Sequence, residues 1–351
     1  MKRILAIDGG GIKGAWPAAF LADIEDSTGC RIVDTFDLIV GTSTGGIIAL
    51  ALGLGISAAD IVRLYEEQGR HIFEPPGPGM RARRRWRASG HLSGLCSLID
   101  VLAGNIAHIS GPKHSSGGLK AALTQQFGSR LLGESQTRLV VPSLNPRIGQ
   151  VYLFKTAHHS RFMRDHKATA VDVALATAAA PTYFPAHTIQ VGSTLVDGGV
   201  WANNPAGLAV VEGIAVLGWK PEEIRLLSLG CTDQPLAVPK RLSAWWLHLP
   251  HVIEVMSRGQ AEGSIGTAKL LLDHTELSPR MFRRTHVVNR ATFSLDAVDH
   301  VGQLAGLGRE DARQFVPTYR QVFLTGDREP FVPYHGVRST KAGDMYPGAI
   351  P

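Results

Sequence analysis

Short apolar runs alternate with longer amphipathic stretches over the first two thirds of the chain. Strand-like runs are predicted at residues 3–7, 36–40, 137–144, 150–156, 193–196 and 225–229. Helical spacing of apolar residues predicts helices at 15–26, 46–54, 58–72, 118–127, 170–179 and 205–217. Short strands joined through helices favour right-handed βαβ units in a parallel sheet. The pattern therefore predicts an α/β core from residue 1 to about 235.

Two parts of the chain depart from this alternation. Residues 73–116 are rich in Pro, Gly, Arg and Ser around one apolar island, and they are expected to leave the sheet as an insertion or partly helical lid. Residues 236–351 are predicted to form a mainly helical C-terminal extension with little sign of catalytic chemistry. The expected organisation is one catalytic domain at 1–235 followed by this extension.

Composition and charge indicate an ordinary globular protein with anionic partners. The 351 residues include 36 Lys and Arg against 30 Asp and Glu, a net charge of +6, which favours phosphates, nucleotides or acidic membrane surfaces. Three cysteines without C-x-x-C spacing argue against a disulfide framework or a zinc site. The first apolar run stops at Asp8, and no stretch approaches the roughly 18 apolar residues of a membrane span. A soluble, cytoplasmic protein is expected.

Glycine-rich turns follow three of the strand-like runs and carry the candidate chemistry. They read Asp8-Gly9-Gly10-Gly11-Ile12-Lys13-Gly14, Gly41-Thr42-Ser43-Thr44-Gly45 and Asp197-Gly198-Gly199. The second fits G-x-S-x-G, in which a serine lies on a sharp strand-to-helix turn with its oxygen exposed. Gly41 and Gly45 stand where side chains would clash with the backbone of the serine. The turns together predict a serine hydrolase with Ser43 as its nucleophile.

The first turn also fits a rival pattern, because Gly9, Gly11 and Gly14 satisfy G-x-G-x-x-G after a strand. That dinucleotide fingerprint expects an acidic residue at the end of the second strand, where this chain has Gly41-Thr42-Ser43. An oxyanion hole suits the turn better, since residues without side chains at a helix start can aim backbone N–H groups at a substrate carbonyl. Lys13 would add positive charge nearby. A dinucleotide-binding or nucleotide-sensing domain is the alternative.

Two kinds of residue are candidates for the general base, a histidine and an aspartate. An α/β-hydrolase would place a histidine after Asp197, and the candidates there are His248, His251, His274, His286 and His300. None of these stands in a strand-glycine turn. Asp197 ends a strand of the same expected sheet and could accept the proton of Ser43 directly. A Ser-Asp-His triad is the alternative to a Ser-Asp pair.

These blocks resemble the signature motifs of the patatin-like phospholipases, in the order of that family. They are the three turns above and the run Ala180-Pro181-Thr182-Tyr183-Phe184-Pro185, and they lie within residues 3–235. The resemblance implies an α/β three-layer fold, with a central, mostly parallel sheet flanked by helices. It also implies hydrolysis of phospholipid acyl esters without a metal or cofactor.

The same resemblance assigns roles to the residues of the turns. Ser43 and Asp197 would form a catalytic dyad without histidine, in which Ser43 carries the acyl group. The oxyanion hole would come from the first turn, with Gly10 and Gly11 helped by Gly9 and Lys13. The supporting glycines of the other two turns would be Gly41, Gly45, Gly198 and Gly199.

A narrower resemblance is to the bacterial patatin-like effectors of cyclic-oligonucleotide antiphage systems, often called CBASS. It rests on the compact N-terminus at the first core strand and on the spacing through His71-Ile72-Phe73. In those effectors a cyclic dinucleotide switches on degradation of the cell's own membrane phospholipids. The resemblance implies a cyclic dinucleotide activator and a phospholipid substrate at the inner membrane surface. It implies no polymeric nucleic acid partner and allows for a homo-oligomer.

Overall fold

The computed structural model describes residues 1–73, 112–233, 249–288, 293–296 and 298–336, apart from the side chains of 249–254. Most of the insertion predicted at 73–116 lies outside them; of its ends, Phe73 caps a helix that ends at Ile72, and Ser116 begins the next described helix. The prediction of a lid therefore stays a prediction.

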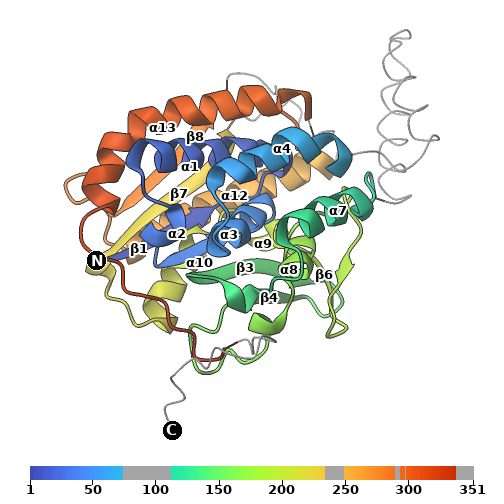
Figure 1. Ribbon diagram of the computed structural model, residues 1–351, viewed down its shortest axis with the longest axis horizontal. Helices are drawn as coiled ribbons and strands as arrows, with labels where there is room; N and C mark the ends of the chain where they lie inside the picture. The colour runs from blue at the N-terminus through green and yellow to red at the C-terminus, as the bar shows by residue number, and fades with distance from the viewer. Residues whose placement is uncertain (74–111, 234–248, 289–292, 297, 337–351) are drawn as a thin grey trace.

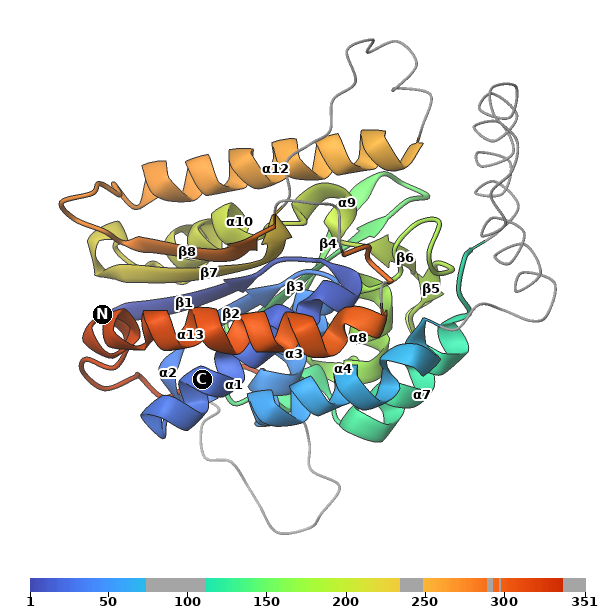
Figure 2. The same ribbon diagram turned by 90° about the horizontal axis from the view of Figure 1, so that it is seen from above.

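A mostly parallel sheet forms the middle of the molecule (Figures 1 and 2). Its strands are β1 (Lys2–Ile7), β2 (Leu38–Gly41), β3 (Arg138–Asn145), β4 (Gln150–Lys155), β5 (His187–Thr188), β6 (Thr194–Asp197), β7 (Ile224–Asp233) and β8 (Met281–Val287). They follow the order β5-β6-β3-β2-β1-β7-β8, and β4 also pairs with β3. The pairs β1–β2, β2–β3, β1–β7 and β7–β8 are parallel, whereas β4, β5 and β6 pair antiparallel.

Helices cover both faces of this sheet, as Figure 2 shows from above. One face carries α1 (Ala15–Thr28), α3 (Thr44–Gly53), α4 (Ala58–Ile72), α7 (Ser116–Phe127), α8 (Ala170–Thr177) and α13 (Val301–Phe323). The other carries α9 (Gly199–Ala202), α10 (Ala206–Val211) and α12 (Leu249–Leu271). The predicted three-layer α/β fold is confirmed. Among the described helices, none has both the length and the apolar character needed to cross a bilayer.

Short helical turns complete the chain between these elements. They are α2 (Ile32–Thr35), η1 (Gly11–Gly14), η2 (Leu132–Glu134), η3 (Asp165–Lys167), η5 (Pro221–Glu223) and η6 (Val298–His300). The helix predicted at 205–217 is split, because α10 passes into the π-helical turn η4 (Glu212–Val216).

The central strands bury side chains on both of their faces. Leu5 and Ile7 of β1 belong to the apolar core on the side of α1 and α3, whereas Ile4 and Ala6 belong to the core on the side of α10 and α12. Strands covered on both faces have no need of alternating polar residues. This explains why the central strands appear in the sequence as continuous apolar runs.

The C-terminal part contributes more than the mainly helical extension predicted for 236–351. Its strand β8 pairs with β7 and forms an edge of the central sheet. Its helix α13 lies along α1 and buries Phe315, Tyr319 and Phe323 in the apolar core on the side of α1 and α3. Within the described residues the C-terminal part is mostly helical but also supplies a strand of the sheet. The division into a catalytic domain at 1–235 and an extension at 236–351 stays a prediction.

Candidate active site

Ser43 lies on a strained turn between β2 and α3. Its backbone has φ 56° and ψ −123°, a conformation that residues with a side chain rarely adopt. The Ser43 amide donates a hydrogen bond of 2.9 Å to Thr177 Oγ1, and the Thr177 hydroxyl donates one of 2.7 Å to the carbonyl oxygen of Pro142. The turn is therefore held from α8 and β3, with the half-buried serine at the start of α3.

Close packing explains the two glycines that flank this serine. A Cβ at Gly41 would lie 2.1 Å from the carbonyl oxygen of Gly45, and a Cβ at Gly45 would lie 2.3 Å from that of Ile7. Side chains are excluded at both positions, as expected. The obstacle differs from the expected one, because it is the other glycine or strand β1 and not the backbone of Ser43.

Asp197 ends β6 and accepts a hydrogen bond from the candidate nucleophile. Ser43 Oγ donates to Asp197 Oδ2 at 2.6 Å, and the Gly199 amide donates to Oδ1 at 2.6 Å. Burial raises the pKa of the Asp197 carboxyl from 3.8 to about 6, against the lowering effect of these two hydrogen bonds. The carboxylate is therefore a stronger base than an ordinary aspartate, and it is still ionised at neutral pH.

Gly198 fits closely beside the same carboxylate. A Cβ at Gly198 would lie 2.3 Å from the carbonyl oxygen of Pro142. That oxygen also accepts the hydrogen bond of Thr177. One peptide group of β3 therefore contacts the turn of Asp197 directly and is linked to the Ser43 amide through Thr177.

The described histidines have other partners. His274 Nδ1 accepts from the amides of Arg280 and Met281, His286 Nδ1 lies 2.8 Å from Asp311 Oδ2, and His300 Nδ1 lies 3.3 Å from Gln303 Oε1. His248 lies outside the described residues, as does the side chain of His251. In the described part of the chain, Ser43 and Asp197 meet without a histidine in contact with either.

The first glycine turn passes directly beside Ser43. A Cβ at Gly9 would lie 3.2 Å from Ser43 Cβ and 2.5 Å from Asn203 Oδ1. The Gly9 amide donates to the carbonyl oxygen of Asn203 at 2.9 Å, so the prediction of Gly9 as an oxyanion donor is not supported. No hydrogen bond from the amides of Gly10 and Gly11 occurs among the described residues. These two amides remain the candidates for the oxyanion hole.

Gly10, Gly11 and Lys13 occupy a crowded stretch of this turn. A Cβ at Gly10 would lie 2.5 Å from Cys231 Sγ, and one at Gly11 would lie 2.3 Å from the carbonyl oxygen of Leu295. Gly11 also has a φ of +57°, which favours glycine. Burial raises the pKa of the Cys231 thiol to about 12, and the nearby charge of Lys13 opposes this shift. The charge of Lys13 therefore acts on Cys231 next to this turn, and its part in an oxyanion hole stays a prediction.

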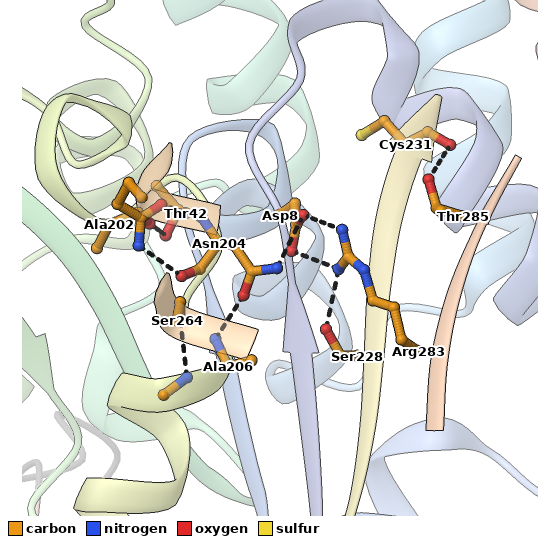
Figure 3. Close-up of polar contacts among 12 residues, drawn as sticks. Asp8, Thr42, Ala202, Asn204, Ala206, Ser228, Cys231, Ser264, Arg283 and Thr285 are labelled. Carbon is orange, nitrogen blue, oxygen red and sulfur yellow. Dashed lines mark hydrogen bonds and ion pairs between the residues drawn. The ribbon is translucent and has the colours of Figure 1, made fainter. Parts of the chain in front are cut away.

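Three contributors to the site were not found by sequence reasoning. Thr177 and Asn203 hold the two turns as described above, and Arg283 of β8 forms an ion pair with Asp8 at the start of the first turn (Figure 3). Asp8 was visible as part of the glycine motif. No local motif marks the other three, because each acts through a partner that is distant in the sequence.

The second strand lacks the acidic residue that a dinucleotide fingerprint expects at its end. The strand β2 ends at Gly41 without an acidic residue, and Asp37 before the strand accepts a hydrogen bond of 2.7 Å from the Arg3 amide. Among the residues with described side chains, no group of three or more His, Cys, Asp or Glu could hold a metal ion. Hydrolysis without a metal stays a prediction.

A solved structure described as VipD from Legionella pneumophila is 14% identical to this chain, with a TM-score of 0.47. The match covers 90% of this chain and 67% of that one. A similarity at this level carries no conclusion about the present site.

Comparisons of sequence are more specific. A protein named cGAMP-activated phospholipase from Pseudomonas aeruginosa (strain BWHPSA011 / Pa011) is 38% identical over 229 residues, covering 65% of this chain and 62% of that protein. One of the same name from Vibrio cholerae serotype O1 is 32% identical over 245 residues, covering 65% and 63%. The chain therefore spans less than two thirds of the length of these relatives. A family model described as patatin-like phospholipase matches residues 5–210, and this chain belongs to that family.

Proposed function

We propose that this protein is a lipid acyl hydrolase of the phospholipase A type, with Ser43 as nucleophile and Asp197 as general base. The observation that carries the proposal is the 2.6 Å hydrogen bond from Ser43 Oγ to Asp197 Oδ2. A serine hydroxyl is a poor nucleophile at neutral pH unless a base takes its proton. The family supports a phospholipid ester as the substrate.

In the first proposed step, Ser43 Oγ attacks the carbonyl carbon of the ester, and its proton passes to Asp197 Oδ2. The carbonyl oxygen becomes an oxyanion, which the amides of Gly10 and Gly11 and the N-terminal end of α3 would stabilise. When the intermediate collapses, the bond to the alcohol oxygen breaks. Asp197 returns the proton to the leaving lysophospholipid, and an acyl group remains on Ser43.

In the second step, Asp197 takes a proton from a water molecule whose oxygen attacks the acyl carbon. A second tetrahedral intermediate forms and collapses, the Ser43–acyl bond breaks, and the serine oxygen recovers its proton from Asp197. The fatty acid leaves. A carboxylate with a pKa of about 6 suits both directions of this proton transfer, because its basicity lies close to the working pH.

We also propose that a cyclic dinucleotide activates this hydrolase and that its substrate lies in a membrane surface. The support is that relatives 38% and 32% identical to this chain are named cGAMP-activated phospholipases. The net charge of +6 favours both an anionic activator and an anionic lipid surface. Action at the inner surface of the cytoplasmic membrane, a homo-oligomeric state and the absence of a polymeric nucleic acid partner stay predictions of this proposal.

Fatty-acid release from phospholipid vesicles tests the proposal. Wild type and Ser43→Ala are compared, each with no nucleotide and with each of several cyclic dinucleotides that include cGAMP. Release should occur with the wild type, rise with at least one cyclic dinucleotide and be absent for Ser43→Ala, whose melting temperature should match the wild type. Equal release by Ser43→Ala would refute the hydrolase mechanism. Equal release with and without every nucleotide would refute the activation alone.

A further inference from the structure

A partly buried ion pair joins the first glycine turn to the strand β8. Arg283 of β8 donates from Nη1 to Asp8 Oδ1 at 2.9 Å and from Nη2 to Asp8 Oδ2 at 2.6 Å (Figure 3). Arg283 Nη1 also donates to Ser228 Oγ of β7 at 2.9 Å. The Asp8 side chain is 7% exposed and that of Arg283 is 20% exposed. Two parallel hydrogen bonds fix the plane of a carboxylate as well as its position.

Asp8 stands where its orientation matters for the turn. It follows β1 directly, its own amide donates to the carbonyl oxygen of Leu229 at 2.9 Å, and the next residue is Gly9 beside Ser43. Asn204 Nδ2 also donates a hydrogen bond to Asp8 Oδ2, at 3.4 Å. With its backbone held by β7 and its carboxylate by β8, Asp8 sets the direction in which the chain enters the turn.

The far end of the turn is also held by a residue beyond β8. The Ile12 amide donates to the carbonyl oxygen of Leu295 at 2.9 Å, and a Cβ at Gly11 would lie 2.3 Å from that same oxygen. Arg283 and Leu295 therefore brace the two sides of Gly10 and Gly11. Both lie outside the 5–210 region that matches the family.

We propose that Arg283 is a positioning residue for the oxyanion turn, and that it acts through Asp8 to aim the amides of Gly10 and Gly11. The inference rests on the hydrolase function proposed above. A buried ion pair is weak evidence of stabilisation, because removing two charges from water offsets much of their attraction. The two parallel hydrogen bonds from Arg283 to Asp8 are better explained as a means of orienting the chain where it enters the turn. The C-terminal part thereby contributes to catalysis by orienting the first glycine turn.

The test compares Arg283→Lys with Arg3→Lys. Lysine keeps the charge at position 283 but cannot form the bidentate pair. Arg3 is the matched control, because it is buried at the opposite end of β1 and donates to the carbonyl oxygens of Thr325 and Gly326, away from the turn. Turnover of p-nitrophenyl butyrate gives kcat and KM in the presence of cGAMP. The inhibition constant of an alkyl trifluoromethyl ketone, whose adduct with serine carries an oxyanion, reports on the oxyanion hole.

Arg283→Lys should lower kcat by about tenfold to a hundredfold and leave KM within about twofold, since displaced oxyanion donors weaken the transition state. Its affinity for the trifluoromethyl ketone should fall by a similar factor. Arg3→Lys should leave kcat and that affinity within about twofold of wild type, whatever it does to the melting temperature. A folded Arg283→Lys with wild-type kcat and ketone affinity would overturn the inference.

Two further comparisons keep the result decisive. If Arg283→Lys does not fold, the uncharged pair Asp8→Asn/Arg283→Gln takes its place: reduced kcat supports the inference, and wild-type kcat overturns it. Ser43→Ala is measured in the same assay. If it turns the ester over as fast as the wild type, the proposed function fails. If only Ser43→Ala loses turnover and the Arg283 variants keep it, the positioning role alone fails.

Discussion

Ser43 Oγ lies 2.6 Å from Asp197 Oδ2, although 154 residues separate them in the chain. Ser43 follows β2 and Asp197 ends β6, and these two strands pair with opposite edges of β3. The carbonyl oxygen of Pro142 in β3 accepts from Thr177, which holds the Ser43 amide, and closely approaches Gly198 beside Asp197. Strand β3, which lies between β2 and β6, thus holds Ser43 and Asp197 next to each other.

The pH dependence of hydrolysis should follow the ionisation of Asp197. Only the ionised carboxylate can accept the serine proton, and burial raises its pKa to about 6. The value of kcat/KM should therefore rise about tenfold per pH unit below pH 6 and become constant above it. Initial rates with a soluble ester between about pH 4.5 and 8 measure this. A profile that is flat from about pH 5 to 7 would exclude a base with this pKa.

Asp197→Asn should reduce kcat by about a thousandfold or more, because asparagine cannot accept the proton. The same change should stabilise the fold at neutral pH. The folded-state pKa of about 6 lies above the ordinary 3.8, so the native state holds the proton more tightly than the unfolded chain. Stability therefore falls as pH rises from about 4 to 6, and the ionised carboxylate then costs up to about 3 kcal/mol.

Urea unfolding at two pH values tests this second effect of Asp197→Asn. The variant should exceed the wild type in free energy of unfolding by about 1 to 3 kcal/mol at pH 8, and by little or nothing at pH 4. A gain of the same size at both pH values would show that the raised pKa is not its cause.

Thr177→Val should impair catalysis more than Thr177→Ser. Valine removes the hydroxyl that accepts from the Ser43 amide, whereas serine keeps it. We expect kcat about tenfold lower and the free energy of unfolding about 1 to 2 kcal/mol lower for the valine variant. Steady-state kinetics and urea unfolding of both variants give the comparison. If valine and serine are equivalent in kcat, the hydroxyl does not hold the nucleophile turn.

Gly10→Ala should be rescued by a second change at Cys231. The added Cβ would lie 2.5 Å from Cys231 Sγ, so the single variant should lose about tenfold or more in kcat. Removing the sulfur with Cys231→Ala leaves the Cβ of that residue 3.2 Å away and should restore most of the loss. Esterase kinetics of both single variants and the pair measure this. No recovery in the pair would show that the clash is not the cause.

Gly11→Ala is the matched control for this rescue. Its obstacle is the backbone oxygen of Leu295 at 2.3 Å, and its φ of +57° disfavours alanine. Neither can be relieved by shortening a side chain. Gly11→Ala should therefore stay impaired in the Cys231→Ala background.

Local patterns in the sequence predicted most of the fold. The helix predicted at 58–72 is α4 (Ala58–Ile72), and the strand predicted at 3–7 is β1 (Lys2–Ile7). In both, the pattern of apolar residues that predicts the secondary structure lies within the element itself, as helical spacing in α4 and as a buried apolar run in β1. β8 was missed because it is an edge strand with the sequence MFRRTHV, in which polar residues interrupt the apolar pattern.

The site shows the same difference between residues in local motifs and residues whose partners are distant in the sequence. Ser43, Asp197 and the first glycine turn stand in local motifs, so their positions could be predicted. Thr177 acts on Ser43 across 134 residues and Arg283 acts on Asp8 across 275, and no short pattern records either pairing. The hydrogen bond from the Gly9 amide to Asn203 could not be predicted for the same reason, because Asn203 meets Gly9 only in the folded chain.

The most direct test of the account is to identify the residue that a fluorophosphonate modifies, since this probe reacts with activated serines. The protein is treated in the presence of cGAMP, digested and mapped by mass spectrometry. We predict one adduct, on Ser43, that forms far more slowly in Asp197→Asn and does not form in Ser43→Ala. An adduct on another residue, or labelling of Ser43→Ala at the wild-type rate, would contradict the Ser43–Asp197 mechanism.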